Sequence, residues 1–342
     1  MIRKTILTAF TTLCALSVAA GATAREDLRI VGSPTIASYA EIVGQAQSNL
    51  GFAEPGISTS NTGPGLKHFC KGTGTLYPDI AMAARKMKPE EAEDCKANGV
   101  AEISEFKIGY DGVLFVYREK DEAFKSFAPT GRQMWLAMAK SVPVNSAVVA
   151  NPYMSWNEID PALPAKPILI YAPDKTAAMR DVFGSVVVKP FCAEEPAIAA
   201  LPEEQRAEVC SALRNDGHIL EFAQAQDIPF AMQETGDQPV GFSNVQIVAT
   251  SPAGKDLQVA MLNGVAPNAA TISSGEYLLS RAHYLYVKNA HVGEVPGIME
   301  FVSAFLSDDA QGPNGYLLSK GWIPLKDDER KEMAARAAGL SN

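Results

Sequence analysis

Residues 58–84 read STSNTGPGLKHFCKGTGTLYPDIAMAA. Within this stretch a Gly/Pro-rich turn at residues 62–65 precedes an amphipathic segment at 66–70, and small apolar residues follow at 79–84. This order predicts a turn, a helix and a strand. The first N–H groups of a helix have no partners inside it and carry the positive end of its dipole, so they can bind an anion. The turn is therefore a candidate anion site; the simpler alternative is that it only begins a helix.

The same alternation of strand, turn and helix continues on both sides of this stretch. Residues 28–31 form a short apolar run, and apolar residues after Pro34 repeat at helical spacing. Further strands are expected over residues 108–117, 168–171, 245–249 and 284–287. Further helices are expected over residues 88–98, 132–139, 177–188 and 203–215 and a last one from Pro296, whereas residues 141–163 look irregular. Strands that alternate with helices predict an α/β fold with largely parallel strands.

Length and composition fit a soluble protein of two domains. The chain has 342 residues, of which 47% are hydrophobic and 20% are charged. No flexible polar linker divides it, so we expect the strands at 108–117 and 284–287 to cross between the domains and to form a hinge beside a cleft. The net charge of -9 argues against binding to nucleic acid or to anionic membrane surfaces.

The N-terminal residues 1–24 read as a secretory signal. Arg3 and Lys4 precede an apolar run at residues 6–20, and Ala22-Thr23-Ala24 provides a small-residue cleavage site. Cys14 follows Leu13 rather than a small residue, which argues against lipid attachment. We therefore expect an extracytoplasmic protein, located in the periplasm if the source is a Gram-negative bacterium.

Four cysteines remain after the signal, and an even number in an exported chain predicts two disulfides. Three pairings are available, and we favour the local ones because each keeps its bridge within one compact unit. The favoured pairs are Cys70–Cys95 and Cys192–Cys210. A zinc site is the alternative, but the sequence has no C-x-x-C and no histidine pair at ligand spacing.

The sequence shows no catalytic motif. It contains no G-x-S-x-G, H-E-x-x-H or P-loop, and its four histidines are scattered. We therefore expect no enzyme activity and no cofactor. A phosphomonoesterase is the catalytic alternative, and the sequence shows no nucleophile–base or metal set for it.

What recurs instead is a short strand, a turn with hydroxyl groups and a helix. The pattern appears at Ser33-Pro34-Thr35, at residues 62–65 and at Asp174-Lys175-Thr176, and the third helix carries Arg180. Three such turns that face one cleft would supply N–H groups, hydroxyls and a guanidinium to a tetrahedral oxyanion. The alternative is that the threonines only cap their helices.

Several segments resemble the substrate-binding protein of bacterial phosphate ABC transporters. They occur in the family's order between residues 28 and 325, and the four cysteines also match a branch of the family. The segments are IVGSPT (30–35), GPGLKHFC (63–70), DIAMAARKMK (79–88), NGV (98–100), KIGYDG (107–112), KTAAMRDVF (175–183), NGVAP (263–267), LSR (279–281), YVKNAHVGEVP (286–296) and GPNGYLLSKGWIPL (312–325).

The resemblance implies a type II periplasmic-binding-protein fold, in which two α/β lobes close on a ligand at a hinge. Lobe one would comprise residues 25–112 and 283–342, and lobe two residues 113–282. A membrane ABC permease would be the partner, and the protein would act as a monomer. The implied ligand-binding residues are Ser33, Thr35, Thr62, Gly63, Arg85, Thr176 and Arg180.

The anion turns depart from the family pattern. Pro34 and Pro64 each remove an N–H donor, and Ala84 precedes Arg85 without the family's hydroxyl. Ala177-Ala178-Met179-Arg180 replaces Ser-Gly-Thr-Arg, and residues 241–245 replace an aromatic Gly-Phe-Phe-Gly-Tyr stretch. We expect an extracytoplasmic solute-binding protein for phosphate or a related oxyanion or acidic ligand, such as a phosphoester, a phosphonate or an organic acid. The alternative is a remodelled paralogue that no longer binds phosphate and acts as a periplasmic sensor or interaction protein.

Overall fold

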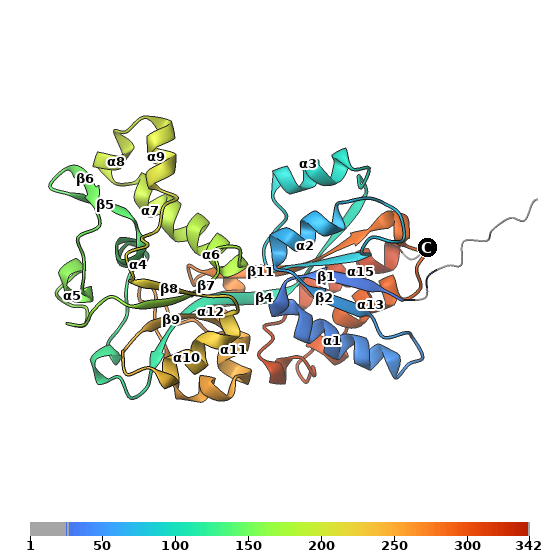
Figure 1. The fold of residues 1–342 in the computed structure, drawn as a ribbon. Coiled ribbons are helices and arrows are strands. Elements are labelled where there is room, and N and C mark those ends of the chain that lie inside the picture. The colour runs from blue at the N-terminus through green and yellow to red at the C-terminus, as the bar shows by residue number, and fades with distance from the viewer. Residues whose placement is uncertain (1–24, 26, 341–342) are drawn as a thin grey trace, which may run out of the picture.

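The computed structural model describes Arg25 and residues 27–340. The predicted signal, residues 1–24, lies outside the described residues. Figure 1 shows two lobes, each with helices packed around its own part of the sheet, joined by the long strands β4 and β11. The two-lobe α/β arrangement confirms the predicted fold class, but the strands are not largely parallel, because the hinge strands β4 and β11 pair antiparallel with their neighbours.

Lobe one contains the sheet portion β2-β1-β3-β11-β4. Strand β1 pairs in parallel with β2 and β3, whereas β11 runs antiparallel to β3 and β4. Its elements are β1 (Arg29–Gly32), α1 (Pro34–Ser48), β2 (Gly56–Thr59), α2 (Thr62–Phe69), β3 (Ile80–Ala83), α3 (Pro89–Ala97), η5 (Asn289–His291), α13 (Ile298–Phe305), α14 (Asp308–Gln311), η6 (Leu318–Lys320) and α15 (Asp327–Leu340). The first two helices begin directly after the strands that precede them, so their N-termini meet at the sheet edge that faces lobe two.

Lobe two contains the sheet portion β4-β9-β7-β8, with β7 parallel to β8 and β9, β10 antiparallel to β4, and a separate hairpin β5–β6. Its strands are β5 (Ser141–Val144), β6 (Ala147–Ala150), β7 (Ile170–Pro173), β8 (Ile219–Phe222), β9 (Val240–Asn244) and β10 (Leu257–Val259). Its helices are η1 (Glu122–Phe124), α4 (Gly131–Met138), α5 (Trp156–Ile159), α6 (Ala178–Phe183), η2 (Gly184–Val188), α7 (Lys189–Ala193), α8 (Pro196–Ala199), α9 (Glu203–Val209), η3 (Ala225–Asp227), α10 (Ile228–Glu234), α11 (Val245–Thr250), η4 (Pro252–Asp256) and α12 (Ala269–Ser274).

The two hinge strands are β4 (Ile103–Arg118) and β11 (Ser280–Lys288). Residues 103–112 of β4 pair with β11, and residues 113–116 pair with β9 of lobe two. One buried cluster is built almost entirely from residues 113–279, and two others draw on both ends of the chain. Separate cores support a division near residues 112/113 and 282/283, and the lobe boundaries remain a prediction.

The prediction of a strand over residues 245–249 is wrong, because this segment is helix α11. The strand lies just before it, at β9, and Asn244 ends that strand. The Asn244 side chain accepts a hydrogen bond from the Ile247 N–H at 2.8 Å, which caps the helix. A run of β-branched residues therefore became helical because its first turn is capped and one side chain, Ile247, is buried.

Four other predictions need correction. Residues 141–163 contain the hairpin β5–β6 and the short helix α5, so they are not wholly irregular. The helix expected over residues 203–215 ends at Val209. Helix α13 is not the last helix, since the polar segment that follows forms α15. The helix expected over 177–188 continues through a π-helical turn, η2, into α7.

The structure confirms both favoured disulfides. Cys70, at the end of α2, bonds to Cys95 of α3, and Cys192 of α7 bonds to Cys210, just after α9. Each bridge thus holds a surface helix to its neighbour within one lobe. Among the described residues no helix is long and apolar enough to cross a membrane.

Candidate functional site

A small cavity lies between the lobes, at the carboxyl ends of the parallel strands. Crevices at this end of parallel strands are the usual ligand sites of open α/β sheets. We call it the interlobe cavity; its volume is about 30 Å³. Lobe one contributes Ser33, Pro34, Thr35, Asn61 and Thr62, and lobe two and the hinge contribute Pro173, Ala177, Ala178, Met179, Ala223, Gln224, Ala225, Gln226, Ile247 and Arg281. The N-terminal turns of α1, α2, α6 and α11 therefore all reach it.

Two glycines allow lobe one to build its side of the cavity. Gly32 ends β1 with a φ of +134°, and a Cβ there would lie 2.2 Å from the Met82 carbonyl oxygen. A Cβ on Gly65 would lie 2.5 Å from the Gly32 Cα. Helix α2 can therefore approach the end of β1 only because both positions lack side chains.

Three hydroxyl groups of lobe one face the interlobe cavity. Ser33 and Thr35 are buried, and neither hydroxyl has a hydrogen-bond partner among the described residues. The Thr62 hydroxyl oxygen accepts the Ala84 N–H at 3.1 Å, so its own hydrogen remains available for donation. These groups, with the unpaired N–H groups of the first helical turns, form a donor-rich wall.

Arg281, at the hinge, supplies a buried cation that the sequence reasoning did not include in the site. Its side chain is 3% exposed, and Nη2 and Nε donate to Asp111 Oδ2 at 2.5 and 3.2 Å. The Arg281 Nη1 atom is buried and has no hydrogen-bond partner within the described part of the chain. The only available signal was the LSR segment at 279–281, which pointed to the family and gave the arginine no role.

The groups behind Arg281 hold it in place. Asp111 Oδ1 accepts the Val245 N–H at 3.2 Å, which ties the hinge to the start of α11. His283 Nε2 lies 3.7 Å from Asp111 Oδ2. Burial lowers the pKa of His283 to about 3, so the ring is neutral and Arg281 carries the positive charge beside Asp111.

Arg85 lies outside the cavity lining and is already paired with carboxylates. It donates to Glu91 at 2.7 and 2.8 Å and, across the lobes, to Asp181 at 3.1 Å. Although burial opposes its charge, these two carboxylates raise the pKa of Arg85. Gly63 lies next to this group, since a Cβ there would be 3.7 Å from Arg85 Nη2.

Thr176 and Arg180 also lie outside the cavity lining. The Thr176 hydroxyl donates to Asp174 at 2.6 Å and accepts from Asn61 Nδ2 of lobe one at 3.1 Å. Arg180 pairs with Glu221 at 3.2 Å, in a second pocket within lobe two. Three predicted site residues, Ser33, Thr35 and Thr62, thus line the cavity, while the other four surround it or face elsewhere.

The lobes are in contact across the cavity. Besides Arg85–Asp181 and Asn61–Thr176, Lys88 lies 3.8 Å from Asp181, and Gln246 of lobe two donates to the Ser38 hydroxyl of lobe one. A volume of about 30 Å³ corresponds to roughly one water molecule. A tetrahedral anion would fit only if the lobes move apart or the lining shifts.

Comparison with known proteins identifies the family. Residues 17–309 match the family model described as PBP superfamily domain. The chain belongs to the PBP superfamily. Among its relatives, Protein SphX of a Synechocystis strain is 25% identical over 89% of this chain and 80% of its own length. The phosphate-binding protein PstS of Staphylococcus saprophyticus is 22% identical over 81% of this chain and 73% of its own.

Several solved structures share the fold. An ABC-type phosphate transport receptor from Vibrio cholerae superposes with a TM-score of 0.59 at 16% identity, covering 87% of this chain and 99% of that chain. PstS from Borrelia burgdorferi gives a TM-score of 0.53 at 14% identity over 88% and 100% of the two chains. These similarities confirm the two-lobe fold for nearly the whole chain.

Proposed function

We propose that this protein captures phosphate or a related small oxyanion in the interlobe cavity and delivers it to a membrane ABC permease. The names of its relatives, which include phosphate-binding proteins, support a ligand of this class. The observation that carries the proposal is the convergence of Arg281, three hydroxyls and several helix N-termini on one cavity. No carboxylate belongs to the described lining, and Asp111 lies behind Arg281, where it offsets only part of the field that an anion meets.

In this proposal the residues in and around the cavity have different roles in binding the ligand. Ser33, Thr35 and Thr62 donate hydroxyl hydrogen bonds, and Arg281 provides the charge. Gly63, Arg85 and Thr176 lie at the interlobe contacts and close over the ligand. Arg180 faces away from the cavity and takes no part in this proposal.

The proposal includes the protein's place in the cell. Export by the signal at residues 1–24 would bring the chain to the periplasm, where it acts as a monomeric binding protein without catalytic activity or cofactor. A permease then receives the ligand when the lobes open.

The altered turns set the expected affinity. Pro34 and Pro64 lack the N–H groups that a glycine or serine would offer. Each hydrogen bond to a charged partner contributes about 1.5–3 kcal/mol, so the loss of two weakens binding by orders of magnitude. We therefore expect the dissociation constant for phosphate to lie above the submicromolar range.

A second function is favoured by the interlobe contacts. Arg85 of lobe one pairs with Asp181 of lobe two, so an internal carboxylate links the lobes beside the cavity. A protein that closes without a ligand could present one fixed surface to a membrane partner, as a periplasmic sensor or interaction protein.

Calorimetry on the purified mature chain tests these functions. The titrants are phosphate, sulfate, methylphosphonate and succinate. Thr35→Val keeps the shape of the side chain and removes a hydroxyl, so it should weaken binding of the best ligand roughly 10- to 100-fold. Ser48→Ala, at the other end of α1, is the matched control and should leave affinity unchanged. Lack of any heat up to millimolar anion would refute capture and favour the second function.

A further inference from the structure

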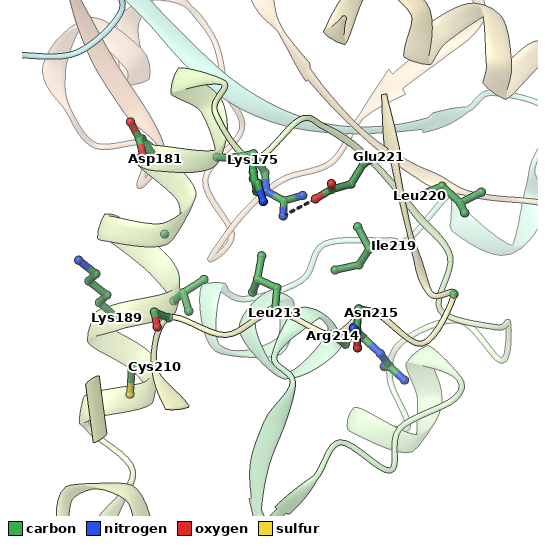
Figure 2. A pocket seen from close by; sticks show the side chains of 15 residues that line it. Lys175, Asp181, Lys189, Cys210, Leu213, Arg214, Asn215, Ile219, Leu220 and Glu221 are labelled. Carbon is green, nitrogen blue, oxygen red and sulfur yellow. Dashed lines mark hydrogen bonds and ion pairs between the residues drawn. The ribbon is translucent and has the colours of Figure 1, made fainter. Parts of the chain in front are cut away.

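A second pocket lies wholly within lobe two. It runs between the helical arm formed by α6, η2 and α7 and the strand β8, beside the segment 210–217 (Figure 2). We call it the lobe-two groove. Its volume is about 750 Å³, against about 30 Å³ for the interlobe cavity. A pocket of this size suits a small organic molecule rather than an inorganic ion.

The lining of the lobe-two groove contains two buried arginines. Arg214 is bonded to Asp216 and to two backbone carbonyls, whereas Arg180 keeps a donor without a partner in the part of the chain that the structure describes. Its side chain is 8% exposed, and its Nη1 atom is buried without a hydrogen-bond partner among the residues described. Its one ion pair runs from Nη2 to Glu221, whose side chain is 46% exposed. A carboxylate so open to water compensates a buried guanidinium only in part.

Nearby carboxylates compensate the positive charge of Arg85 more fully than that of Arg180. Two carboxylates raise the pKa of Arg85, whereas burial lowers the pKa of Arg180, and Glu221 and Asp174 offset that effect only partly. An additional anion would therefore gain more electrostatic stabilisation at Arg180 than at Arg85.

Two lysines extend the positive charge of the groove. Lys175 lies beside the Arg180–Glu221 pair, and Lys189 lies further along the helical arm (Figure 2). Both side chains are exposed, and neither makes an ion pair with any residue in the described part of the chain. The groove thus carries two lysines without ion pairs of their own to described residues, although Asp174 offsets part of the Lys175 charge and Asp181 also lines the groove.

The middle of the groove is apolar. Leu213 and Ile219 lie between the charged ends and point into the space (Figure 2), and Val188 lines it as well. Strand β8 is the last strand of its sheet. Since His218 and Phe222 carbonyls accept from β7, the backbone groups of Ile219 and Glu221 point away from that strand. They offer polar contacts along the open edge.

We propose that the lobe-two groove binds an amphiphilic organic anion. Its carboxylate or phosphate lies at Arg180 and Lys175, where it displaces the Glu221 side chain into water, and its apolar body covers Leu213 and Ile219. This site goes beyond the proposed capture of a small oxyanion, because an inorganic ion has no apolar part to fill the groove.

Calorimetry with phenyl phosphate, benzoate and inorganic phosphate tests the proposal on the full mature chain. The two aromatic anions should bind the groove, and the stronger one identifies the preferred acidic group. Glu221→Ala removes the competing carboxylate and should tighten binding about threefold or more. Lys175→Ala should weaken it about threefold, and Lys255→Ala, an exposed lysine elsewhere on lobe two, should leave it unchanged. Both groove substitutions lie at exposed residues, and because Glu221 pairs with the buried Arg180, circular dichroism first checks that Glu221→Ala is folded.

Opposite signs for Glu221→Ala and Lys175→Ala separate a binding site from a structural role. Thr35→Val, which alters the interlobe cavity, should not change the affinity for phenyl phosphate. If that variant alone weakens phenyl phosphate, or if neither aromatic anion binds, the groove proposal is refuted. Failure of the interlobe proposal would show separately. In that case phosphate, sulfate, methylphosphonate and succinate would all fail to bind.

Discussion

Single residues decide whether the wall of the interlobe cavity can form, and Gly32 is the clearest case. Its φ is +134°, and a Cβ at this position would lie only 2.2 Å from the Met82 carbonyl oxygen, so there is no room for a side chain. Gly32→Ala should lower the free energy of unfolding by about 2–4 kcal/mol, because strain and a backbone clash add together. Urea denaturation followed by circular dichroism measures the change.

Gly74→Ala is the matched control. Gly74 is exposed, and a Cβ there would meet no atom within 4 Å. This substitution should change the free energy of unfolding by less than about 1 kcal/mol. Equal effects of the two substitutions would contradict the account of Gly32.

Lys288 should make stability depend on pH. Its ammonium donates to the Gly72 carbonyl at 2.6 Å, and burial lowers its pKa from 10.5 to about 8. Between these values the unfolded chain binds a proton that the folded chain lacks, so the contribution of Lys288 to stability rises with pH. Below pH 8 both states are protonated, and the contribution is constant at its lowest level.

The pH prediction is measured as a difference between the wild type and Lys288→Met. Unfolding by urea at pH 7, 8, 9 and 9.5 should show the wild type gaining stability relative to the variant above pH 8. Buried tyrosines titrate alike in both proteins and cancel in the difference. A difference that stays constant over this range would show that Lys288 keeps an ordinary pKa.

At the scale of elements, the sequence predicted the order of strands and helices better than it predicted where β9 becomes α11. Residues 245–249 are rich in β-branched side chains, and local propensity favours a strand there. The cap at Asn244 and the packing of Ile247 outweigh that propensity. Such tertiary packing is not visible in a local pattern.

The Asn244 cap can be tested directly. Asn244→Ala removes the acceptor for the Ile247 N–H and should cost about 1–2 kcal/mol of stability. Asn157→Ala, at an exposed position of α5 whose side chain makes no hydrogen bond with the described residues, should cost less than about 0.5 kcal/mol. Urea denaturation compares the two. If both cost the same, the Asn244 side chain does not act as a cap.

The candidate site was likewise only partly predictable from the sequence. Ser33, Thr35 and Thr62 could be proposed from sequence because helix starts after parallel strands face the same edge. Arg281 could not, since its place depends on β11 returning to the hinge and on Asp111 holding the guanidinium. The orientation of the Arg180 side chain could not be predicted from the sequence either, because it depends on Glu221, 41 residues later in the chain.

At the scale of the whole molecule, the hinge strands leave the lobes free to turn unless contacts across the cavity hold them. Away from the hinge, four polar side-chain contacts join the lobes among the described residues: Arg85–Asp181, Lys88–Asp181, Asn61–Thr176 and Ser38–Gln246. Asp181 takes part in two of the four. It is therefore the residue whose charge most affects the balance between open and closed lobes.

Asp181→Asn keeps the size of this side chain and removes its charge, so it should shift the lobes toward the open state. The Arg85–Asp181 pair is partly exposed, with side chains 11% and 35% accessible, and its loss should cost about 1 kcal/mol, roughly a fivefold change in the ratio of open to closed molecules. Small-angle scattering without ligand should show a larger radius of gyration for Asp181→Asn than for the wild type. Asp94→Asn, an exposed aspartate of lobe one, should leave the scattering curve unchanged. If Asp181→Asn also leaves it unchanged, Asp181 does not hold the lobes together, and the second function loses the contact on which it depends.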